Sequence, residues 1–400
     1  MSSSSPLRVL SIAHTAVSRA AGRLRYHPLG RRPDVDVDLV VPARWHQFGR
    51  TVEADPPDDP GIRVHALPIW FPNAGPLSWY LHVYPGLRRI MREAKPHVVH
   101  LWEEPWSLVA LQACMLKGDA ALVLEVDQNL MKRLPPPFEA IRKYVLRRTD
   151  HVVARSPLAA AVVWTKGYRG PVSYTGYGVD QATFRPSNQP PAADAAEAKL
   201  QLGYVGRIVA DKGLDDALDA MARSRFRVDL AIMGEGPHEA ELRQRVRRLG
   251  LEGRVSFQRW GAPADVARFI QSLDALILLT RTTRTTLEQF GRVIVEAQSC
   301  GVPVIGSSSG AIPSVIGEGG WVVPERDPQA LAELLNTIAP DAEARRLRGD
   351  AGRNNVDTRF TYERIAQDLA DAWIGAASGG AAQAPNVVYR PNAPSPNGRA

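Results

Sequence analysis

The sequence predicts an α/β protein built from two doubly wound parallel sheets. Short apolar runs of the kind that form buried strands alternate with helical segments along the chain. The alternation is interrupted once by a stretch rich in Pro and Ala, and it then starts again. Strands that alternate with helices form βα units and therefore parallel sheets. With 400 residues the chain also exceeds what one core usually holds, so two domains are expected.

Seven apolar runs predict the strands of the first sheet, and helical patterns such as 106–118 and 138–149 separate several of them. Residues 186–198 are rich in Pro and Ala and lack periodicity, which is typical of a linker. We therefore expect an N-terminal domain at 1–185. The expected strands are LRVLSIA (7–13), VDVDLVV (35–41), IRVHALP (62–68), PHVVHLW (96–102), ALVLEV (121–126), DHVVARS (150–156) and PVSYTG (171–176).

A second domain is expected at 199–360, where six further strand-like runs alternate with helical ones. Residues 361–376 have the pattern of an amphipathic helix, which we expect to pack back on the N-terminal domain. The tail at 377–400 is rich in Gly, Ala, Pro and Asn and is expected to be disordered. The six runs are KLQLGYVGR (199–207), RVDLAIMGEG (227–236), RVSFQRW (254–260), DALILLT (274–280), VPVIGSS (302–308) and GGWVVP (319–324).

Composition limits the classes of partner. The formal charge of +7 favours anionic partners such as sugar nucleotides or phospholipid headgroups. Nucleic acid is not expected, because the chain carries no recognisable motif for it. Two isolated cysteines, an N-terminus without a basic signal-peptide region and the lack of a long apolar stretch predict a cytoplasmic protein.

The stretch EQFGRVIVEAQSCGVPVI (288–305) predicts an anion site. A helix is expected to begin near Arg292, where its first amides and its dipole attract a phosphate that Gly291 lets approach closely. Glu288 precedes this helix, and Glu296 lies on it, where its carboxylate can accept hydrogen bonds from a ribose. The plainer interpretation is that Glu288 caps the helix and Glu296 lies exposed or in an ion pair.

A second part of the anion site is expected in GYVGRIVADKG (203–213). Gly206 ends the first strand of the domain, and Arg207 and Lys212 follow before the next helix. A glycine turn with two cations at a strand-to-helix junction offers a diphosphate close backbone approach and positive charge. A tight turn with two surface cations is the alternative.

These motifs together resemble the large family of retaining glycosyltransferases with the GT-B fold. The resemblance implies two Rossmann-like domains that face a central cleft, and a reaction that moves a hexosyl group from a nucleotide diphosphate sugar to an acceptor hydroxyl with retention. A weaker likeness extends into the first half of the chain. The matching segments are 203–213, GEGP (234–237) and 288–316, with PHVVHLW (96–102) and GVDQATFRP (178–186) as the weaker ones.

The resemblance also implies roles for single residues. Arg207 and Lys212 match cations that hold the donor diphosphate and stabilise it as it leaves, Glu288 faces the transferred sugar, and Glu296 binds the ribose. Further donor contacts are implied for the amides of Phe290, Gly291, Arg292 and Val293. Trp260 stands where such enzymes hold the base, although packing in the core is the alternative for it.

The first half departs from the family pattern in two places. The first loop carries Arg19, Arg23 and Arg25 where relatives often have a glycine pair, so these cations either contact the donor or are solvated. Asp127 stands where many relatives carry a histidine close to the reacting sugar. Either Asp127 or Glu125 could orient the acceptor or act as base, or both could cap the following loop.

Further candidates concern the acceptor and a membrane surface. Arg281 and Arg284 precede Glu288 and could recognise a phosphate or carboxylate of the acceptor. The helical segments 80–95 and 138–149 mix cations with apolar residues, which predicts either peripheral contact with an anionic membrane or ordinary surface helices.

No metal or other cofactor is expected. The acidic run DVDVD (34–38) reads as a strand rather than as a metal-binding motif, and Arg207 and Lys212 can neutralise a diphosphate. The expected function is therefore that of a metal-independent hexosyltransferase whose acceptor is a saccharide or a lipid-linked saccharide of surface polysaccharide or glycolipid synthesis. A sugar-nucleotide epimerase of the same fold and a noncatalytic sugar-nucleotide-binding protein are the alternatives.

Overall fold

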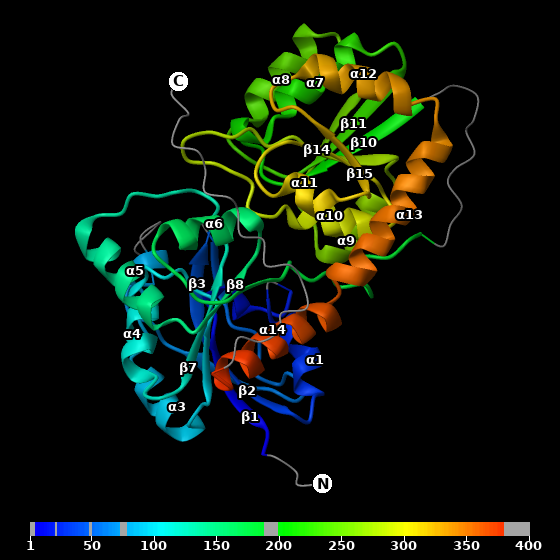
Figure 1. Cartoon of the computed structure of the whole chain (residues 1–400). Helices are drawn as coiled ribbons and strands as arrows, with labels where there is room; N and C mark the ends of the chain where they lie inside the picture. The colour runs from blue at the N-terminus through cyan, green and yellow to red at the C-terminus, as the bar shows by residue number, and fades with distance from the viewer. Residues whose placement is uncertain (1–4, 21, 48–49, 73–77, 188–198, 380–400) are drawn as a thin grey trace. The chain divides into compact units, whose positions relative to one another are not determined.

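The chain is divided into two compact units, one of Met1–Gly176 with Tyr362–Ala400 and the other of Tyr177–Thr361. The computed structural model describes residues 5–20, 22–47, 50–72, 78–187 and 199–379. The predicted linker therefore falls mostly outside the described residues, as does the predicted tail beyond residue 379. Figure 1 labels the elements of both units.

A sheet of seven parallel strands forms the centre of the first unit, in the order β5-β2-β1-β6-β7-β8-β9. All seven predicted strands are confirmed, and the burial of the central ones on both faces explains their nearly continuous apolar sequences. The strands are β1 (Leu7–Ile12), β2 (Val35–Pro42), β5 (Arg63–Leu67), β6 (Val98–Leu101), β7 (Ala121–Val126), β8 (His151–Ala154) and β9 (Val172–Tyr174).

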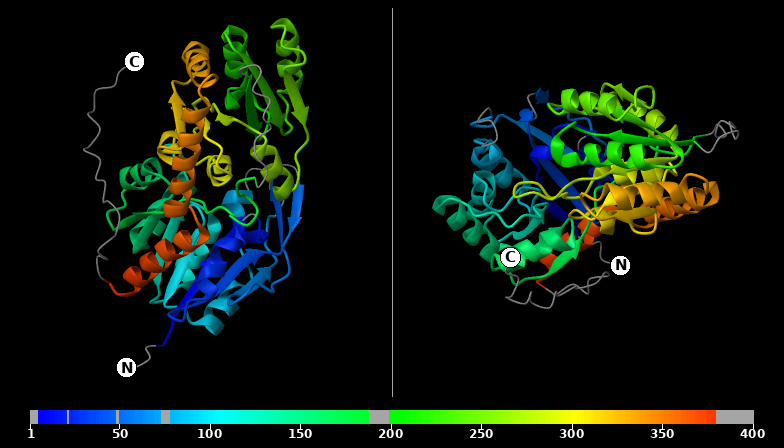
Figure 2. Two further views of the ribbon diagram at one scale, coloured as in Figure 1. Left: turned by 90° about the vertical axis from the view of Figure 1, so that its right-hand side faces the viewer. Right: turned by 90° about the horizontal axis from the view of Figure 1, so that it is seen from above.

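Helices cover both faces of this sheet. Helices α3, α4 and α5 lie together on one face, while α1 and the chain-terminal α14 contact each other on the opposite face (Figure 1). Figure 2 shows α14 running along the strands, which it contacts through β6, β7 and β8. The helices are α1 (His27–Gly30), α2 (Ser78–Leu81), α3 (Leu87–Ala94), α4 (Leu108–Leu116), α5 (Pro136–Arg148), α6 (Pro157–Thr165) and α14 (Tyr362–Ala377).

A small antiparallel hairpin of β3 (Arg44–Gln47) and β4 (Arg50–Glu53) follows β2. This hairpin was not predicted, because its polar residues do not form an apolar run. None of the helices within the part of the chain that the structure describes combines the length and apolar character that crossing a bilayer requires.

Six parallel strands form the sheet of the second unit, in the order β12-β11-β10-β13-β14-β15. All six predicted strands are again confirmed. They are β10 (Lys199–Val205), β11 (Arg227–Met233), β12 (Val255–Gln258), β13 (Ala275–Leu278), β14 (Val304–Ser307) and β15 (Gly320–Val323).

The helices of the second unit form two layers. Helix α7 contacts α8 and α12 in one layer, and α9, α11 and α13 each contact α10 in the other (Figure 1). The helices are α7 (Leu214–Arg223), α8 (Glu239–Arg248), α9 (Pro263–Gln271), α10 (Arg292–Ser299), α11 (Ile312–Ile316), α12 (Pro328–Ile338) and α13 (Ala342–Arg359).

Each sheet reverses its strand order at one point. In the first sheet the chain proceeds outward in opposite directions from β1 and β6, and in the second from β10 and β13. The loops that leave the carboxyl ends of two such strands diverge, which opens a crevice where ligands of doubly wound sheets bind. The loops after β10 and β13 carry the residues that the sequence motifs single out.

Candidate active site

Lys212, Glu288 and Thr280 form a cluster at the switch point of the second sheet. Lys212 Nζ donates to Glu288 Oε2 at 2.6 Å and to Thr280 Oγ1 at 3.3 Å, and Thr280 Oγ1 donates to the same Glu288 oxygen at 2.6 Å. Thr280 is buried, whereas the side chains of Lys212 and Glu288 keep 19% and 14% of their surface exposed. The buried hydroxyl of Thr280 therefore orients the ion pair, which remains accessible to a ligand. Thr280 was not among the predicted site residues, since its sequence position indicates only the last residue of a strand.

Two glycines hold the backbone on which this cluster depends. Gly213 starts helix α7 with φ +68°, and a Cβ built there would lie 2.1 Å from the carbonyl oxygen of Leu279. Gly310 has φ +56°, and its Cβ would lie 2.1 Å from the carbonyl oxygen of Glu288, which accepts the Ala311 amide at 3.0 Å. Only a residue without a side chain allows these close approaches. The loop that bears Lys212 is thus packed directly on the segment that leads to Thr280 and Glu288.

Replacing Gly213 by Ala is expected to lower the free energy of unfolding by about 1–3 kcal/mol and to lower activity, because the methyl group must push the Leu279 backbone away. The matched control is Gly250→Ala. Gly250 has nearly the same φ of +65°, but a Cβ built there would have no atom within 4 Å. Its replacement by Ala therefore measures the loss of stability that the positive φ alone causes. Urea unfolding curves measure both; equal losses in the two variants would contradict the packing role of Gly213.

Arg207 lies in the same loop system and is exposed. The hydroxyl of Tyr204, on strand β10, donates to the Arg207 carbonyl oxygen at 2.8 Å and so fixes the turn after the strand. Burial, together with the negative charge of Glu288, raises the pKa of the Tyr204 hydroxyl well above its ordinary value. The strand end, the turn with Gly206 and the Lys212–Glu288 pair therefore form one local structure.

Helix α10 begins at Arg292, directly after Gly291, as the motif predicts. Its residue Glu296 is half-buried, and burial raises the pKa of that carboxyl against the opposing charge of Arg292. Phe290 is 3% exposed and packs between the rings of Tyr177 and Phe360, with centroids 5.2 and 5.5 Å away. The Phe290 side chain is therefore part of the core, and any donor contact from this residue must come from its backbone. Val293 is half-buried beside it.

Trp260 is 52% exposed after strand β12. The alternative of core packing is therefore wrong, and a stacking surface remains. Arg281 is engaged by both oxygens of Asp216, at 2.7 and 2.8 Å, and this pairing raises the pKa of the guanidinium. The pair favours a structural role for Arg281 over contact with an acceptor. Arg284 is exposed.

Glu125 lies in the first unit in a buried network of charges. Its carboxylate pairs with Arg155 and with Arg25, whose Nη1 donates at 2.8 Å, and His100 Nε2 lies 3.2 Å away. Burial alone would raise the pKa of this carboxyl, but the charges of Arg155 and Arg25 outweigh it and hold that pKa far below its ordinary value. The Glu125 side chain has no exposed surface, so we assign it a structural role in place of the acceptor-side role expected from the sequence.

Asp127 is more accessible than Glu125, with 19% of its side chain exposed. Arg155 Nε donates to Asp127 Oδ1 at 2.9 Å, and Trp102 Nε1 approaches Oδ2 at 3.4 Å. Arg155 thus links the two carboxylates, and Asp127 keeps the better placement for contact with a ligand.

The remaining charged candidates of the first unit are held in ion pairs with other residues of that unit. In the run DVDVD, Asp38 accepts from Arg63 at 2.7 Å and pairs with His65 at 2.7 Å, which accounts for it without a metal. Arg23 is buried and donates to Asp59 at 2.9 Å. Arg23 and Arg25 are thus buried and are not accessible to a donor. Arg19 keeps 36% of its side chain exposed beside two aspartates.

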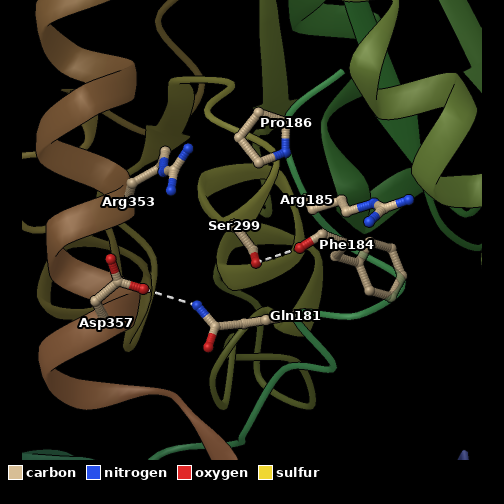
Figure 3. A pocket seen from close by; sticks show the side chains of 7 residues that line it. All are labelled: Gln181, Phe184, Arg185, Pro186, Ser299, Arg353 and Asp357. Carbon is tan, nitrogen blue, oxygen red and sulfur yellow. Dashed lines mark hydrogen bonds between the residues drawn. The ribbon is translucent and has the colours of Figure 1, made fainter. Parts of the chain in front are cut away.

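One cavity of the second unit is lined largely by the segments 178–186 and 288–316 but contains none of the candidate site residues. Its volume is about 230 Å³. Figure 3 shows that Ser299 donates to the Phe184 carbonyl oxygen and that Gln181 donates to Asp357, which ties the walls together. The lining residues are Gln181, Phe184, Arg185, Pro186, Ser299, Arg353 and Asp357.

Two family profiles each match one part of the chain. The family profile described as Glycosyl transferases group 1 matches residues 187–355, and that described as Glycosyltransferase Family 4 matches residues 30–182. N-acetyl-alpha-D-glucosaminyl L-malate synthase of Bacillus anthracis is 32% identical over 174 residues, which are 42% of this chain and 44% of that protein. The match thus spans less than half of that relative.

A longer match decides the family. GDP-mannose-dependent alpha-(1-6)-phosphatidylinositol monomannoside mannosyltransferase of Mycobacterium tuberculosis is 30% identical over 285 residues, which are 67% of this chain and 72% of that protein. The chain belongs to glycosyltransferase family 4. The Lys212–Glu288 cluster of this glycosyltransferase lies within the segment that the group 1 profile matches.

A solved structure confirms the predicted fold of the glycosyltransferase. HepE of Anabaena in complex with UDP superposes with a TM-score of 0.68 at 19% identity, covering 91% of this chain and 98% of that chain. At this identity the likeness shows the fold alone, which is the GT-B fold with its two α/β domains.

Proposed function

We propose that this glycosyltransferase moves a hexosyl group from a nucleotide diphosphate sugar to an acceptor hydroxyl, with retention and without a metal ion at the diphosphate. The observation that carries the proposal is the ion pair of Lys212 and Glu288 at the switch point of the second sheet. A cation that holds phosphate beside a carboxylate that holds sugar hydroxyls is the arrangement that a nucleotide sugar requires.

The donors of Lys212 support this role. An ammonium group carries three N–H donors, and among the described residues Glu288 and Thr280 accept two of them. The third can point at a phosphate oxygen without breaking the cluster. Because these contacts exist before the donor binds, the positive charge is in place when negative charge develops on the leaving diphosphate. Arg207 adds a second cation in the same loop.

Glu288 and Glu296 divide the rest of the donor between them in this proposal. Glu288 Oε2 is fixed by Lys212 and Thr280, which orients the carboxylate toward the hydroxyls of the transferred sugar. Glu296, which lies on helix α10, would accept hydrogen bonds from the ribose hydroxyls. Between them, the backbone at Gly291, Arg292 and Val293 would donate to phosphate at the positive end of the helix dipole.

The acceptor is proposed to be a saccharide or a lipid-linked saccharide of surface polysaccharide or glycolipid synthesis. The family relation to a phosphatidylinositol monomannoside mannosyltransferase supports this class. Within the first unit, Asp127 is the candidate for orienting the acceptor hydroxyl, since it is the more exposed of the two carboxylates that Arg155 links.

Peripheral contact with an anionic membrane is also proposed, and its character follows from helix α3. Leu87 and Ile90 are buried, while Arg88, Arg89 and Arg92 are exposed, so this helix offers charge but no apolar anchor. Binding should therefore be electrostatic. The protein is expected to sediment with anionic vesicles at low salt and to be released at high salt; binding to neutral vesicles would contradict this.

The direct test of the proposed function is the release of nucleoside diphosphate from UDP- and GDP-sugars in the presence of saccharide and glycolipid acceptors. Release that depends on acceptor, proceeds equally with and without added Mg²⁺, and gives a product with the donor's anomeric configuration by NMR is expected. Conversion of the donor sugar without acceptor would instead identify an epimerase. Binding of donor with no turnover across the acceptor panel would identify a noncatalytic binding protein.

Trp260 provides a prediction for the nucleotide base. If its exposed ring stacks on the base, Trp260→Ala should weaken binding of the nucleoside diphosphate by roughly 5- to 150-fold, because stacking of one base contributes about 1–3 kcal/mol. Isothermal titration calorimetry measures the affinity. Leu347→Ala, which removes a similarly exposed apolar side chain from α13, is the control; equal affinities in the two variants would remove Trp260 from the site.

A further inference from the structure

The first sheet carries a cluster of metal-ligand side chains at its own switch point. His14 follows β1, Glu103 follows β6, and His82 follows the short helix α2. One ligand atom from each of these three side chains lies within 4.8 Å of the other two, and all three residues are buried. We propose that His14, His82 and Glu103 bind one divalent transition-metal ion, with zinc as the best fit. The inference does not rest on the proposed function.

The distances within the cluster fit this proposal. His14 Nδ1 lies 2.7 Å from Glu103 Oε2, and His82 Nε2 lies 3.7 Å from Glu103 Oε1, which is beyond hydrogen-bond range for those two atoms. Ligands of a tetrahedral zinc ion stand about 3.3 Å apart, since each lies about 2.0–2.1 Å from the metal. These two separations lie on either side of that spacing, and adjustment of the side chains would bring the three ligands to one ion.

The remaining contacts of Glu103 give its carboxylate a fixed orientation. Glu103 Oε1 accepts the backbone N–H of His14 at 2.9 Å. A second oxygen held by a backbone donor is typical of metal-binding carboxylates.

A second observation points to a ligand at the same place. Trp45 and Tyr84 are buried, and Trp45 Nε1 and Tyr84 Oη have no hydrogen-bond partner among the described residues. The Trp45 ring lies 4.6 Å from the ring of His14 and 5.0 Å from that of His82, and the Tyr84 ring lies 5.8 Å from that of His82. Buried polar atoms almost always have partners. A water molecule as the fourth ligand of the ion would supply one.

The donor set selects the class of metal. Two imidazoles and one carboxylate suit Zn²⁺ and its neighbours in the first transition row, whereas Mg²⁺ and Ca²⁺ prefer oxygen ligands alone. The ion would join the loops after β1 and β6 to the segment after α2. It would thus tie together three segments that are far apart in the sequence, and its role is separate from the handling of the diphosphate by Lys212.

The test uses the full-length protein, freed of metal with a chelator and titrated with Zn²⁺ and with Co²⁺. We expect one ion per chain, a rise in melting temperature on binding, and the visible absorption bands of tetrahedral Co²⁺. His82→Ala and Glu103→Gln should each weaken the affinity by at least about 100-fold, because each removes a ligand. His65→Ala, which removes a histidine paired with Asp38, should leave it unchanged.

X-ray absorption of the zinc-loaded wild-type protein supplies a readout that needs no variant to fold. Two imidazoles and oxygen ligands would support the proposal. Failure of the wild-type protein to bind either ion, binding that persists in both ligand variants, or a zinc environment without two imidazoles would each overturn it. In the first of those cases the cluster is a hydrogen-bonded network alone.

Discussion

Lys212→Ala is expected to lower kcat/KM by about 10²–10³, because it removes a positive charge that is in place before the diphosphate begins to leave. Thr280 remains as a partner of the Glu288 carboxylate in this variant, so the local structure should persist. Initial rates of nucleoside diphosphate release at subsaturating donor measure the effect. Glu288→Ala should give a loss of at least tenfold, since it removes the contact to the transferred sugar.

The control for this prediction is Lys199→Ala. Lys199 lies in the same unit at the beginning of β10 and pairs with Asp229 at 3.0 Å, but 47% of its side chain is exposed. Its removal should leave kcat/KM within about twofold of the wild type, because surface pairs contribute little. Melting temperatures of both variants exclude a loss of folded protein. Wild-type turnover in a folded Lys212→Ala protein would remove Lys212 from the catalytic machinery.

Glu125→Ala is expected to lower the free energy of unfolding by about 3–5 kcal/mol, because it leaves the guanidinium groups of Arg25 and Arg155 buried without this carboxylate. In this variant Asp127 can balance the charge of Arg155 only in part. Arg25 keeps its stacking on Trp102, with the Arg25 Cζ 4.4 Å from the ring centroid. Denaturant unfolding followed by fluorescence and circular dichroism measures the loss.

Glu363→Ala is the matched control for the buried carboxylate. Glu363 pairs with Arg31 at 3.1 Å, but both side chains are more than two-thirds exposed, at 69% and 67%. An exposed pair contributes about 0–1 kcal/mol, so this variant should unfold almost as the wild type does. If Glu125→Ala were equally mild, the network would not stabilise the first sheet, and a role for Glu125 with a ligand would have to be reconsidered.

Most of the fold was predictable because buried parallel strands have nearly continuous apolar sequences. The thirteen strands of the two large sheets all fall on predicted runs. The hairpin of β3 and β4 was missed because its residues are polar and depend on tertiary contacts. The helical segment expected at 80–95 is divided at Pro85, with α2 before it and α3 after it, because proline interrupts a helix.

The candidate site was predictable only as far as motifs are local in sequence. The segments with Lys212 and Glu288 could be recognised because each lies beside a glycine-containing turn. Thr280 could not, since a hydroxyl at the end of a strand acquires its role only when the neighbouring loop folds over it. The exposure of Trp260 and the burial of Glu125 likewise depend on the packing around them.

The cluster of His14, His82 and Glu103 illustrates the same limit. Its residues are separated by 68 and 21 positions, so no metal-ligand spacing is visible in the sequence. The parallel sheet brings His14 and Glu103 together, because β1 and β6 are neighbours and both residues follow the carboxyl ends of their strands. A signal that could have found them is the placement of polar residues directly after two strands that flank a switch point.

The measurement that tests the central claim most directly is calorimetric titration of the wild type and Lys212→Ala with a nucleoside diphosphate and the corresponding monophosphate, for both uridine and guanosine. If Lys212 holds the terminal phosphate, the wild type binds the diphosphate more tightly than the monophosphate, and Lys212→Ala loses that preference. An equal preference in the wild type and the variant would contradict the assignment of the Lys212–Glu288 cluster as the diphosphate site.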